Sequence, residues 1–267
     1  MRDRARTVLS EPLGYDGDAW STGPQRVYDR LAERAVGLLA TDLRDRSALD
    51  AGAGTGALTR ALLARGAQVD AADTSADMLA QLRRQTPAVG MTTVADIRAL
   101  PIADASYDVS VAGFVLNHLR DPEVALLELS RVTRTGGQVV ATTFGVNDPP
   151  AKRVVERVLS THGWSPPDWY VALKEHAFPL TETVSAFTAV AHKAGLNARV
   201  DAATVDFGDL DAGALAAWRL GMAPVTPFLS TLSEPQRRAL TEEAVDAVRS
   251  TPPLQLPMLV LVAGVPA

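Results

Sequence analysis

The sequence lacks cysteine altogether, which excludes disulfide bonds, thiolate metal sites and a cysteine nucleophile. It also lacks a long hydrophobic run. The longest, at residues 258–265, is far shorter than the roughly 20 residues that a membrane helix needs, so we predict a buried strand there and no membrane partner. Residues 1–12 have no apolar stretch behind their arginines and do not resemble a secretory signal. These absences predict a cytoplasmic protein, and no metal ion is expected.

Basic residues are outnumbered, with 26 Lys and Arg against 31 Asp and Glu in 267 residues, for a formal net charge of -5. A nucleic-acid substrate requires many basic side chains to neutralise its phosphates, so we expect a small-molecule partner and no nucleic acid. Hydrophobic residues make up 47% of the chain, which is enough for a sizeable core, and we favour one domain with insertions. The sequence leaves the oligomeric state open, with a homodimer as one option.

From residue 47 onwards, short apolar runs alternate with helical stretches, a pattern typical of parallel strands joined by crossover helices. Two later apolar segments would complete the sheet as a late strand pair. The prediction is a doubly wound, mostly parallel α/β sheet of seven strands. The expected strands are 48–51, 68–72, 91–95, 108–112, 138–144, 199–207 and 258–265, and the expected helices are 55–65, 75–85, 122–134, 181–194, 211–221 and 234–249.

Four parts of the chain differ in character. Residues 1–45 are predicted to form an N-terminal helical cap, in which Gly23-Pro24 opens an amphipathic helix. Residues 46–145 are predicted to form a cofactor-binding core. Proline and tryptophan interrupt the pattern after the fifth strand, so residues 146–198 are predicted to be a lid or substrate insertion with a helix. Residues 199–267 would supply the last strands of the sheet and a helical insert.

The sharpest motif is LDAGAGTG at residues 49–56, where a strand runs directly into three alternating glycines. Glycines let a ligand approach the backbone closely, and the helix that follows offers free N–H groups. The spacing G-x-G-x-G differs from the dinucleotide fingerprint G-x-G-x-x-G, because residue 57 is Ala. The next strand ends in Asp73, where a nucleotide-type site needs a carboxylate for two ribose hydroxyls. A nicotinamide-dependent oxidoreductase therefore stays open as an alternative at this point.

Further motifs follow in order: DTSADML at 73–79, the segment 96–102, the segment 107–122 and Gly136-Gly137, which we expect to close the helix before the fifth strand. With these motifs the chain resembles the class I S-adenosylmethionine-dependent methyltransferases, specifically the small-molecule group that includes the ubiquinone and menaquinone biosynthesis enzymes. The resemblance covers roughly residues 45–145. It implies a Rossmann-like fold, S-adenosylmethionine as cofactor and S-adenosylhomocysteine as product.

The resemblance implies a role for each residue of the glycine loop and its acidic partner. Gly52, Gly54 and Gly56, together with Asp50, would line the methionine part of the cofactor, and Asp73 would hold the ribose diol. Asp50 could instead merely cap the loop that follows it. For Asp73 we prefer the binding role, because a carboxylate that ends an apolar strand would otherwise lie at a costly position.

The same resemblance implies the adenine end of the site. Asp96 would accept a hydrogen bond from the adenine amino group, with the backbone of Ile97 beside the ring. Thr74 and Phe114 are also expected to contact the cofactor. Met78 could pack against the adenine ring, although an ordinary role on the core face of its helix is the simpler interpretation.

Residues that follow the fourth strand face the transferred methyl group in this family. His118 is therefore the candidate general base, since histidine titrates near neutral pH, and Asn117 could orient it or the acceptor. A purely structural or acceptor-orienting role for His118 stays open. His162 and His176, in the insertion, are more often structural, and we expect His192 to be a solvated surface residue.

Only 5% of the residues are aromatic, so their clustering in the cap and the insertion is informative. Tyr15, Trp20, Trp164 and Trp169 are predicted to form an apolar or aromatic acceptor pocket, although they could simply seal a lid onto the core. The sequence thus favours a small-molecule methyltransferase, with O-methylation of a secondary metabolite or quinone-like acceptor ahead of N- or C-methylation. The main alternative is a protein with the same cofactor site that catalyses a non-methylating rearrangement or cyclisation.

Overall fold

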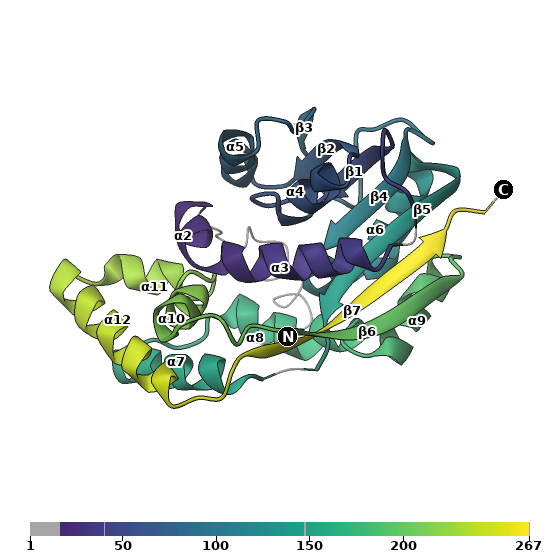
Figure 1. Cartoon of the computed structure of the whole chain (residues 1–267). Coiled ribbons are helices and arrows are strands. Elements are labelled where there is room, and N and C mark those ends of the chain that lie inside the picture. Colours follow the sequence, from purple (N-terminus) through teal and green to yellow (C-terminus); the bar gives the residue numbers. More distant parts are fainter. Residues whose placement is uncertain (1–16, 40, 147, 267) are drawn as a thin grey trace.

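A computed structural model describes residues 17–39, 41–146 and 148–266, and its centre is one seven-stranded sheet (Figure 1). The strand order is β3-β2-β1-β4-β5-β7-β6. The first five strands run parallel, and β7 is antiparallel to both β5 and β6. The predicted Rossmann-like, mostly parallel sheet is confirmed. The strands are β1 Ser47–Ala51, β2 Gln68–Asp73, β3 Thr92–Val94, β4 Tyr107–Gly113, β5 Thr133–Phe144, β6 Ala198–Asp206 and β7 Gln255–Gly264.

Helices cover both faces of the sheet, which explains why its central strands are apolar runs. On one face, helices α3 (Pro24–Gly37) and α4 (Ala57–Ala64) share a core cluster with Val109 and Val111 of β4. On the opposite face, helices α6 (Pro122–Val132) and α9 (Val184–Lys193) share a second core cluster. Helix α5 (Ala76–Gln85) packs on β2 near the edge of the sheet. Among the described residues, no helix combines the length and the apolar character needed to cross a bilayer.

The direction in which strands are added to the sheet reverses at β1. From β1 the chain goes out to β2 and β3, then returns to place β4 on the other side of β1. In open α/β sheets a crevice forms at such a switch point, outside the carboxyl ends of the strands. The loops after β1, β2 and β4 are therefore the positions where a ligand site is expected.

A layer of further helices flanks that edge of the sheet. Helix α10 packs against α3, α7 and α12, and Figure 1 shows α7, α10, α11 and α12 gathered at one end of the molecule. Helix α9 instead packs on β6 and α6. The predicted insertion at 146–198 therefore contains α7, which belongs to this layer of helices, and α9, which covers the sheet. The remaining helices are α2 Gly17–Thr22, α7 Pro150–Thr161, α8 Asp168–His176, α10 Ala212–Leu220, α11 Thr226–Thr231 and α12 Glu234–Arg249.

One local prediction was wrong. We expected Gly136-Gly137 to close the third helix, but α6 already ends at Val132 and both glycines lie inside β5. The pairing of β4 with β5 shifts there, because Tyr107 opposes Thr133 whereas Val109 opposes Gln138. The extra residues form a bulge, and Gly136 at φ +79° supplies the left-handed backbone conformation that the bulge requires.

Candidate functional site

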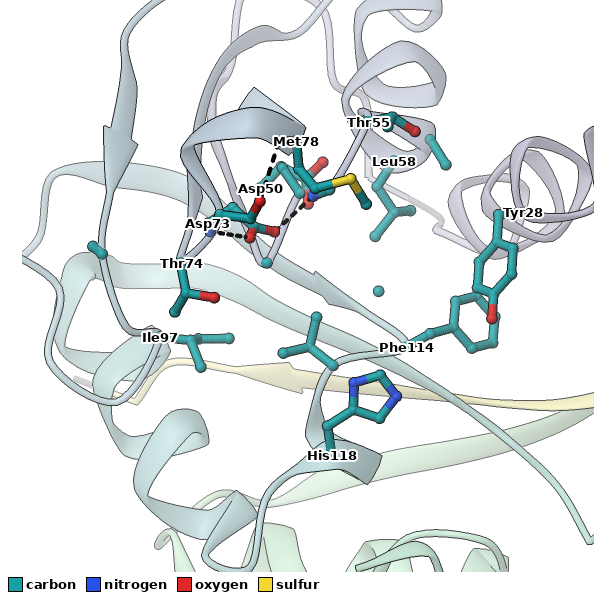
Figure 2. Close-up of a pocket in the computed structure, with 18 of the residues that line it drawn as sticks. Tyr28, Asp50, Thr55, Leu58, Asp73, Thr74, Met78, Ile97, Phe114 and His118 are labelled. Atoms are coloured by element: carbon teal, nitrogen blue, oxygen red, sulfur yellow. Dashed lines mark hydrogen bonds between the residues drawn. The ribbon is translucent and has the colours of Figure 1, made fainter. Parts of the chain in front are cut away.

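A cavity of about 570 Å³ lies at the carboxyl ends of β1, β2 and β4, at the switch point of the sheet (Figure 2). Its lining comes from the glycine loop, the end of β2, the loop after β3, the segment after β4 and the helices α2, α3, α4 and α5. The predicted site residues that the structure brings together here are Trp20, Asp50, Gly52, Gly54, Asp73, Thr74, Met78, Asp96, Ile97, Phe114 and His118. Their roles in binding or catalysis stay predictions.

The glycine loop needs its glycines for more than one reason. Gly52 has φ +78°, and a Cβ there would lie 2.3 Å from a methyl group of Val115. Gly54 has φ +54°, but the nearest atom to a Cβ would be the Met78 methyl carbon at 3.5 Å, so this glycine borders open space. Gly56 does not line the cavity; its glycine is required by φ +92° and by close packing on Leu82. The loop therefore presents its backbone to the cavity chiefly at Gly54.

Asp73 joins the end of β2 to the glycine loop. Its Oδ2 accepts the Gly54 N–H at 2.8 Å, and its Oδ1 accepts the Ser75 N–H at 2.8 Å. Burial raises the pKa of Asp73 from its ordinary value, and the backbone N–H donors oppose that rise. Each carboxylate oxygen has a second lone pair, so Asp73 can still accept hydrogen bonds from two ligand hydroxyls.

Asp50 is the most buried charged group of the cavity, with 1% of its surface exposed. Its Oδ2 accepts the Thr59 hydroxyl at 2.7 Å, whereas its Oδ1 has no hydrogen-bond partner among the described residues. Burial raises the pKa of Asp50 to about 6. A buried carboxylate oxygen without a donor is costly, so the cavity fits a ligand that brings a positively charged donor to this position.

The loop after β3 carries an ion pair that the sequence analysis did not anticipate. Arg98, which also lines the cavity, binds Asp96 with an Nη2–Oδ2 distance of 2.7 Å and reaches Asp121 at 3.3 Å. The guanidinium lowers the pKa of Asp96 and occupies part of its acceptor capacity. A ligand amino group at Asp96 would therefore share the carboxylate with Arg98, beside the buried side chain of Ile97.

An aromatic wall lies at the other end of the cavity; we use this name for Trp20, Tyr28 and Phe114, which line it, and for Phe144, which packs on Tyr28 and Phe114 outside the lining. The centroids of the Trp20 and Tyr28 rings are 4.7 Å apart, and Phe114 lies 5.4 Å from Tyr28 and 4.5 Å from Phe144. Phe114 has φ +57°, an unfavourable backbone conformation for an aromatic residue that recurs at functional sites. Tyr28 was not predicted from the sequence, because the amphipathic pattern of α3 indicates a helix that packs on the core and nothing more.

His118 lies on a short 3₁₀ helix, Leu116–His118, directly after β4. An ordinary histidine titrates near neutral pH, but burial lowers the pKa of His118 to about 4. The imidazole is therefore neutral at physiological pH and a weak base. Asn117 is 4% exposed, its side-chain oxygen has no hydrogen-bond partner among the described residues, and it does not line the cavity.

The other residues predicted for the acceptor pocket lie elsewhere. Trp164 is buried and donates its indole N–H to the Pro224 carbonyl, and Trp169 packs edge-on against Tyr170; neither lines the cavity. Tyr15 lies outside the described residues. The three remaining histidines are likewise outside the lining: His162 hydrogen-bonds Glu243 at 2.8 Å, and His176 and His192 are exposed.

Comparison with known proteins agrees with this geometry. Residues 49–141 match the family model described as a methyltransferase domain. That segment includes the whole glycine loop, Asp73, Asp96 and His118. No group of three or more metal-ligating side chains is found in the part of the chain that the structure describes.

Curated relatives cover part of this chain and part of their own length. A malonyl-[acyl-carrier protein] O-methyltransferase of Halorhodospira halophila is 40% identical over 45% of this chain and 41% of the relative. A demethylmenaquinone methyltransferase of Renibacterium salmoninarum is 35% identical over 48% of this chain and 52% of the relative. The chain thus spans about half the length of the curated relatives it matches.

Solved structures share the fold over most of the chain. The phosphoethanolamine N-methyltransferase 2 of Haemonchus contortus, in complex with S-adenosyl-L-methionine, matches 89% of this chain and 52% of its own with a TM-score of 0.54 and 16% identity. The geranyl diphosphate C-methyltransferase of Streptomyces coelicolor matches 90% and 79% with a TM-score of 0.51 and 18% identity. The fold is that of the class I methyltransferases, and the match of residues 49–141 to the methyltransferase-domain model agrees with it.

Proposed function

We propose that this protein binds S-adenosylmethionine in the cavity and transfers its methyl group to a small molecule. The observation that carries the proposal is the arrangement of two acids around one glycine loop. Asp73 is hydrogen-bonded to the loop at Gly54, and Asp50 beside it keeps one carboxylate oxygen without a hydrogen-bond partner among the described residues. This arrangement suits a ligand that has both a ribose diol and an ammonium group.

The residues of the cavity fit this cofactor part by part. Asp50 would hold the ammonium of the methionine end, Asp73 the ribose hydroxyls, and Asp96 with Ile97 the adenine. When bound, S-adenosylmethionine supplies an electrophilic methyl group on a sulfonium, so the protein need only orient the acceptor and exclude water. The aromatic wall adjoins this region and can serve both purposes, because its rings are apolar and packed against one another.

The chemical class of the methyl acceptor is inferred from the cavity wall, the net charge and the relatives together. The relatives and structural neighbours are named for oxygen, nitrogen and carbon acceptors. We propose a small aromatic or quinone-like secondary metabolite with O-methylation favoured, since the wall is aromatic and the net charge of -5 disfavours nucleic acid. The neutral state of His118 adds a constraint, because an imidazole whose pKa is about 4 deprotonates only acceptors that are themselves fairly acidic.

The proposal is tested by measuring ligand binding and product formation separately. Saturation with S-adenosylhomocysteine at about 100 times its Kd should stabilise the protein by about 2.7 kcal/mol and raise its Tm by roughly 5 to 10 °C. Incubation with S-adenosylmethionine and an acceptor should release S-adenosylhomocysteine. Binding without release would favour the rearrangement alternative, and a thermal shift with NAD but with neither of these two ligands would disprove the proposal.

The pH dependence of turnover tests the role of His118. If His118 acts as the base, the rate at saturating cofactor should stay flat from about pH 8 down to about pH 5 and fall only near pH 4, where the imidazole is protonated. The variant His118→Asn, which keeps a hydrogen-bonding side chain but cannot take up the proton, should lower kcat at least tenfold with little change in cofactor affinity. An inflection near pH 6.5 that disappears in His118→Asn would contradict the low pKa, and unchanged kcat would remove His118 from the reaction.

A further inference from the structure

Arg219 is an unusual buried cation close to the aromatic wall. It lies on α10 with 3% of its side chain exposed, and its Nη2 donates to the carboxylate of Glu156 on α7. Its guanidinium carbon lies 5.7 Å from the centroid of the Tyr170 ring on α8. The Nε–H is buried and has no hydrogen-bond partner among the described residues. Leaving a charged donor unpaired in the interior is costly, which suggests that this N–H serves a ligand.

The packing of α10 brings this cation close to Tyr28, which lines the cavity, whereas Arg219 and Tyr170 do not line it. The end of α10 lies directly on the start of α3, since a Cβ at Gly23 would be only 2.1 Å from the carbonyl oxygen of Ala217. Tyr28 lies just over one turn further along α3 and lines the cavity. In Figure 2 the ring of Tyr28 projects from α3 beside Phe114, with the hydroxyl at its far end.

Electrostatics agree with this proximity. Burial raises the pKa of the Tyr28 phenol, the Tyr170 phenol raises it further, and the positive charge of Arg219 lowers it. The two phenols and the guanidinium therefore lie within electrostatic range of one another. Neither hydroxyl makes a hydrogen bond with another described residue. Three donors from three different helices thus gather beside this end of the cavity, which Tyr28 lines.

We propose that Tyr28, Tyr170 and Arg219 form a subsite that binds a carboxylate group of the methyl acceptor. The acceptor would lay an aromatic or apolar body against the aromatic wall and direct its carboxylate towards the guanidinium. This inference rests on the proposed function and specifies the acceptor class.

Glu156 does not prevent such binding, because it has a second cation nearby. The ammonium of Lys152 lies 4.0 Å from the same carboxylate oxygen of Glu156 and also binds Asp148 at 2.9 Å. When an acceptor carboxylate engages Arg219, Lys152 can keep Glu156 partly neutralised. Charge-assisted hydrogen bonds to a planar guanidinium are short and strong, so they discriminate well between a carboxylate and a neutral group of the same shape.

A matched pair of probes tests the subsite without any knowledge of the natural acceptor. Calorimetry on the full chain saturated with S-adenosylhomocysteine compares 2-naphthoate with 2-naphthamide, which differ in charge but hardly in shape. Saturation fills the cofactor part of the cavity and keeps the probes away from Arg98. We expect 2-naphthoate to bind at least tenfold more tightly. Equal affinity, or tighter binding of the amide, would overturn the proposal.

Variants separate ligand binding from structural support. Glu156→Gln should free the guanidinium and raise naphthoate affinity severalfold, whereas a purely structural ion pair predicts that both probes bind less tightly. The double variant Arg219→Met with Glu156→Gln removes both charges together and should abolish the preference for naphthoate. Tyr28→Phe and Tyr170→Phe should each weaken naphthoate about threefold or more and leave naphthamide much less affected.

Control measurements separate the possible failures. If the double variant does not fold, Arg219→Lys keeps the charge but lacks the Nε–H, and it should reduce the preference for naphthoate while S-adenosylhomocysteine still binds. An undiminished preference in either variant would overturn the subsite. Failure of the unmodified protein to bind S-adenosylhomocysteine would refute the proposed function instead, and binding of that ligand with no naphthoate preference would refute the subsite alone.

Discussion

Replacing Asp73 with alanine is expected to weaken the binding of S-adenosylmethionine and S-adenosylhomocysteine by roughly two to four orders of magnitude. The carboxylate would lose two hydrogen bonds to ribose hydroxyls, and hydrogen bonds to a charged group contribute about 1.5 to 3 kcal/mol each. Both ligands should be affected equally, because they share the ribose. Titration calorimetry with each ligand provides the measurement.

The loss should exceed the direct contacts because Asp73 also shapes the loop. Its two oxygens hold the N–H groups of Gly54 and Ser75, each at 2.8 Å. Without them, Gly54 is no longer tied to the end of β2, although Gly52 and Ala53 still donate to the Ala72 carbonyl. We therefore expect a looser loop on an intact strand, and lower affinity without loss of the fold.

Asp70→Asn is the matched control. Asp70 lies on the same strand, and its carboxylate accepts hydrogen bonds from the Tyr107 hydroxyl and the Met91 N–H, outside the cavity. The control should lower the Tm and leave the affinity for both ligands unchanged. If Asp73→Ala binds S-adenosylhomocysteine with nearly normal affinity, or loses no more than Asp70→Asn does, the ribose assignment is wrong.

The sheet and half of the site could be predicted because their signals are local. A central parallel strand is covered on both faces, so β4 is buried at most positions, and Asp50 and Asp73 lie at the carboxyl ends of β1 and β2. Adjacent parallel strands end at the same edge, which means that motifs far apart in the sequence must converge there. The convergence of Asp50, Gly54, Asp73 and Asp96 on one cavity follows from this rule.

The aromatic wall could not be predicted in the same way, because it depends on how distant helices pack. The periodicity of α3 identifies a buried face but not the surface it covers, so Tyr28 gave no signal of its own. Its contacts with Phe114 and Phe144 depend on α3 lying across α4 and α10. For Trp164 the sequence predicted a contact that the structure does not show. Its place in a proline-rich insertion suggested a contact with the methyl acceptor, but its indole N–H donates to the Pro224 carbonyl and it does not line the cavity.

Titration behaviour is the other property that sequence could not supply. The sequence gives only the ordinary pKa values of histidine and aspartate. In the folded protein, burial shifts the pKa values of His118 and Asp50 in opposite directions. It lowers the pKa of His118 to about 4 and raises that of Asp50 to about 6, in each case against the charged form. Both shifts therefore come from the depth of the cavity, which no local motif records.

Replacing Asp50 with asparagine should stabilise the unliganded protein and weaken cofactor binding at the same time. The folded-state pKa of about 6 lies above the ordinary value of 3.8, so folding takes up a proton between about pH 4 and 6 and stability falls as the pH rises through that range. Above pH 6 the buried charge costs about 3 kcal/mol, since one pKa unit corresponds to about 1.4 kcal/mol. Asp50→Asn removes that cost and should raise the Tm at pH 8 by roughly 6 to 12 °C, with little change at pH 4.

Cofactor affinity should change in the opposite direction, because the ammonium of S-adenosylmethionine needs the ionised carboxylate. At pH 8 Asp50→Asn should bind about 10- to 100-fold more weakly. In the unmodified protein the affinity should fall as the pH drops below about 6, and in Asp50→Asn that dependence should disappear. Calorimetry at pH 5 and pH 8, together with thermal melts without ligand, measures both effects.

Thr59→Val supplies a variant that shifts the same carboxylate the other way. The Thr59 hydroxyl donates to Asp50 at 2.7 Å and lowers its pKa, so removing it should raise the pKa further and move the pH midpoint of cofactor binding upwards. The unliganded Thr59→Val protein should be less stable at pH 8, whereas Asp50→Asn should be more stable. Two neighbouring substitutions with opposite effects on stability are hard to explain by disrupted packing alone. If Asp50→Asn destabilises the protein equally at pH 4 and pH 8, or leaves the affinity unchanged, the buried carboxylate is a structural group and the ammonium binds elsewhere in the cavity.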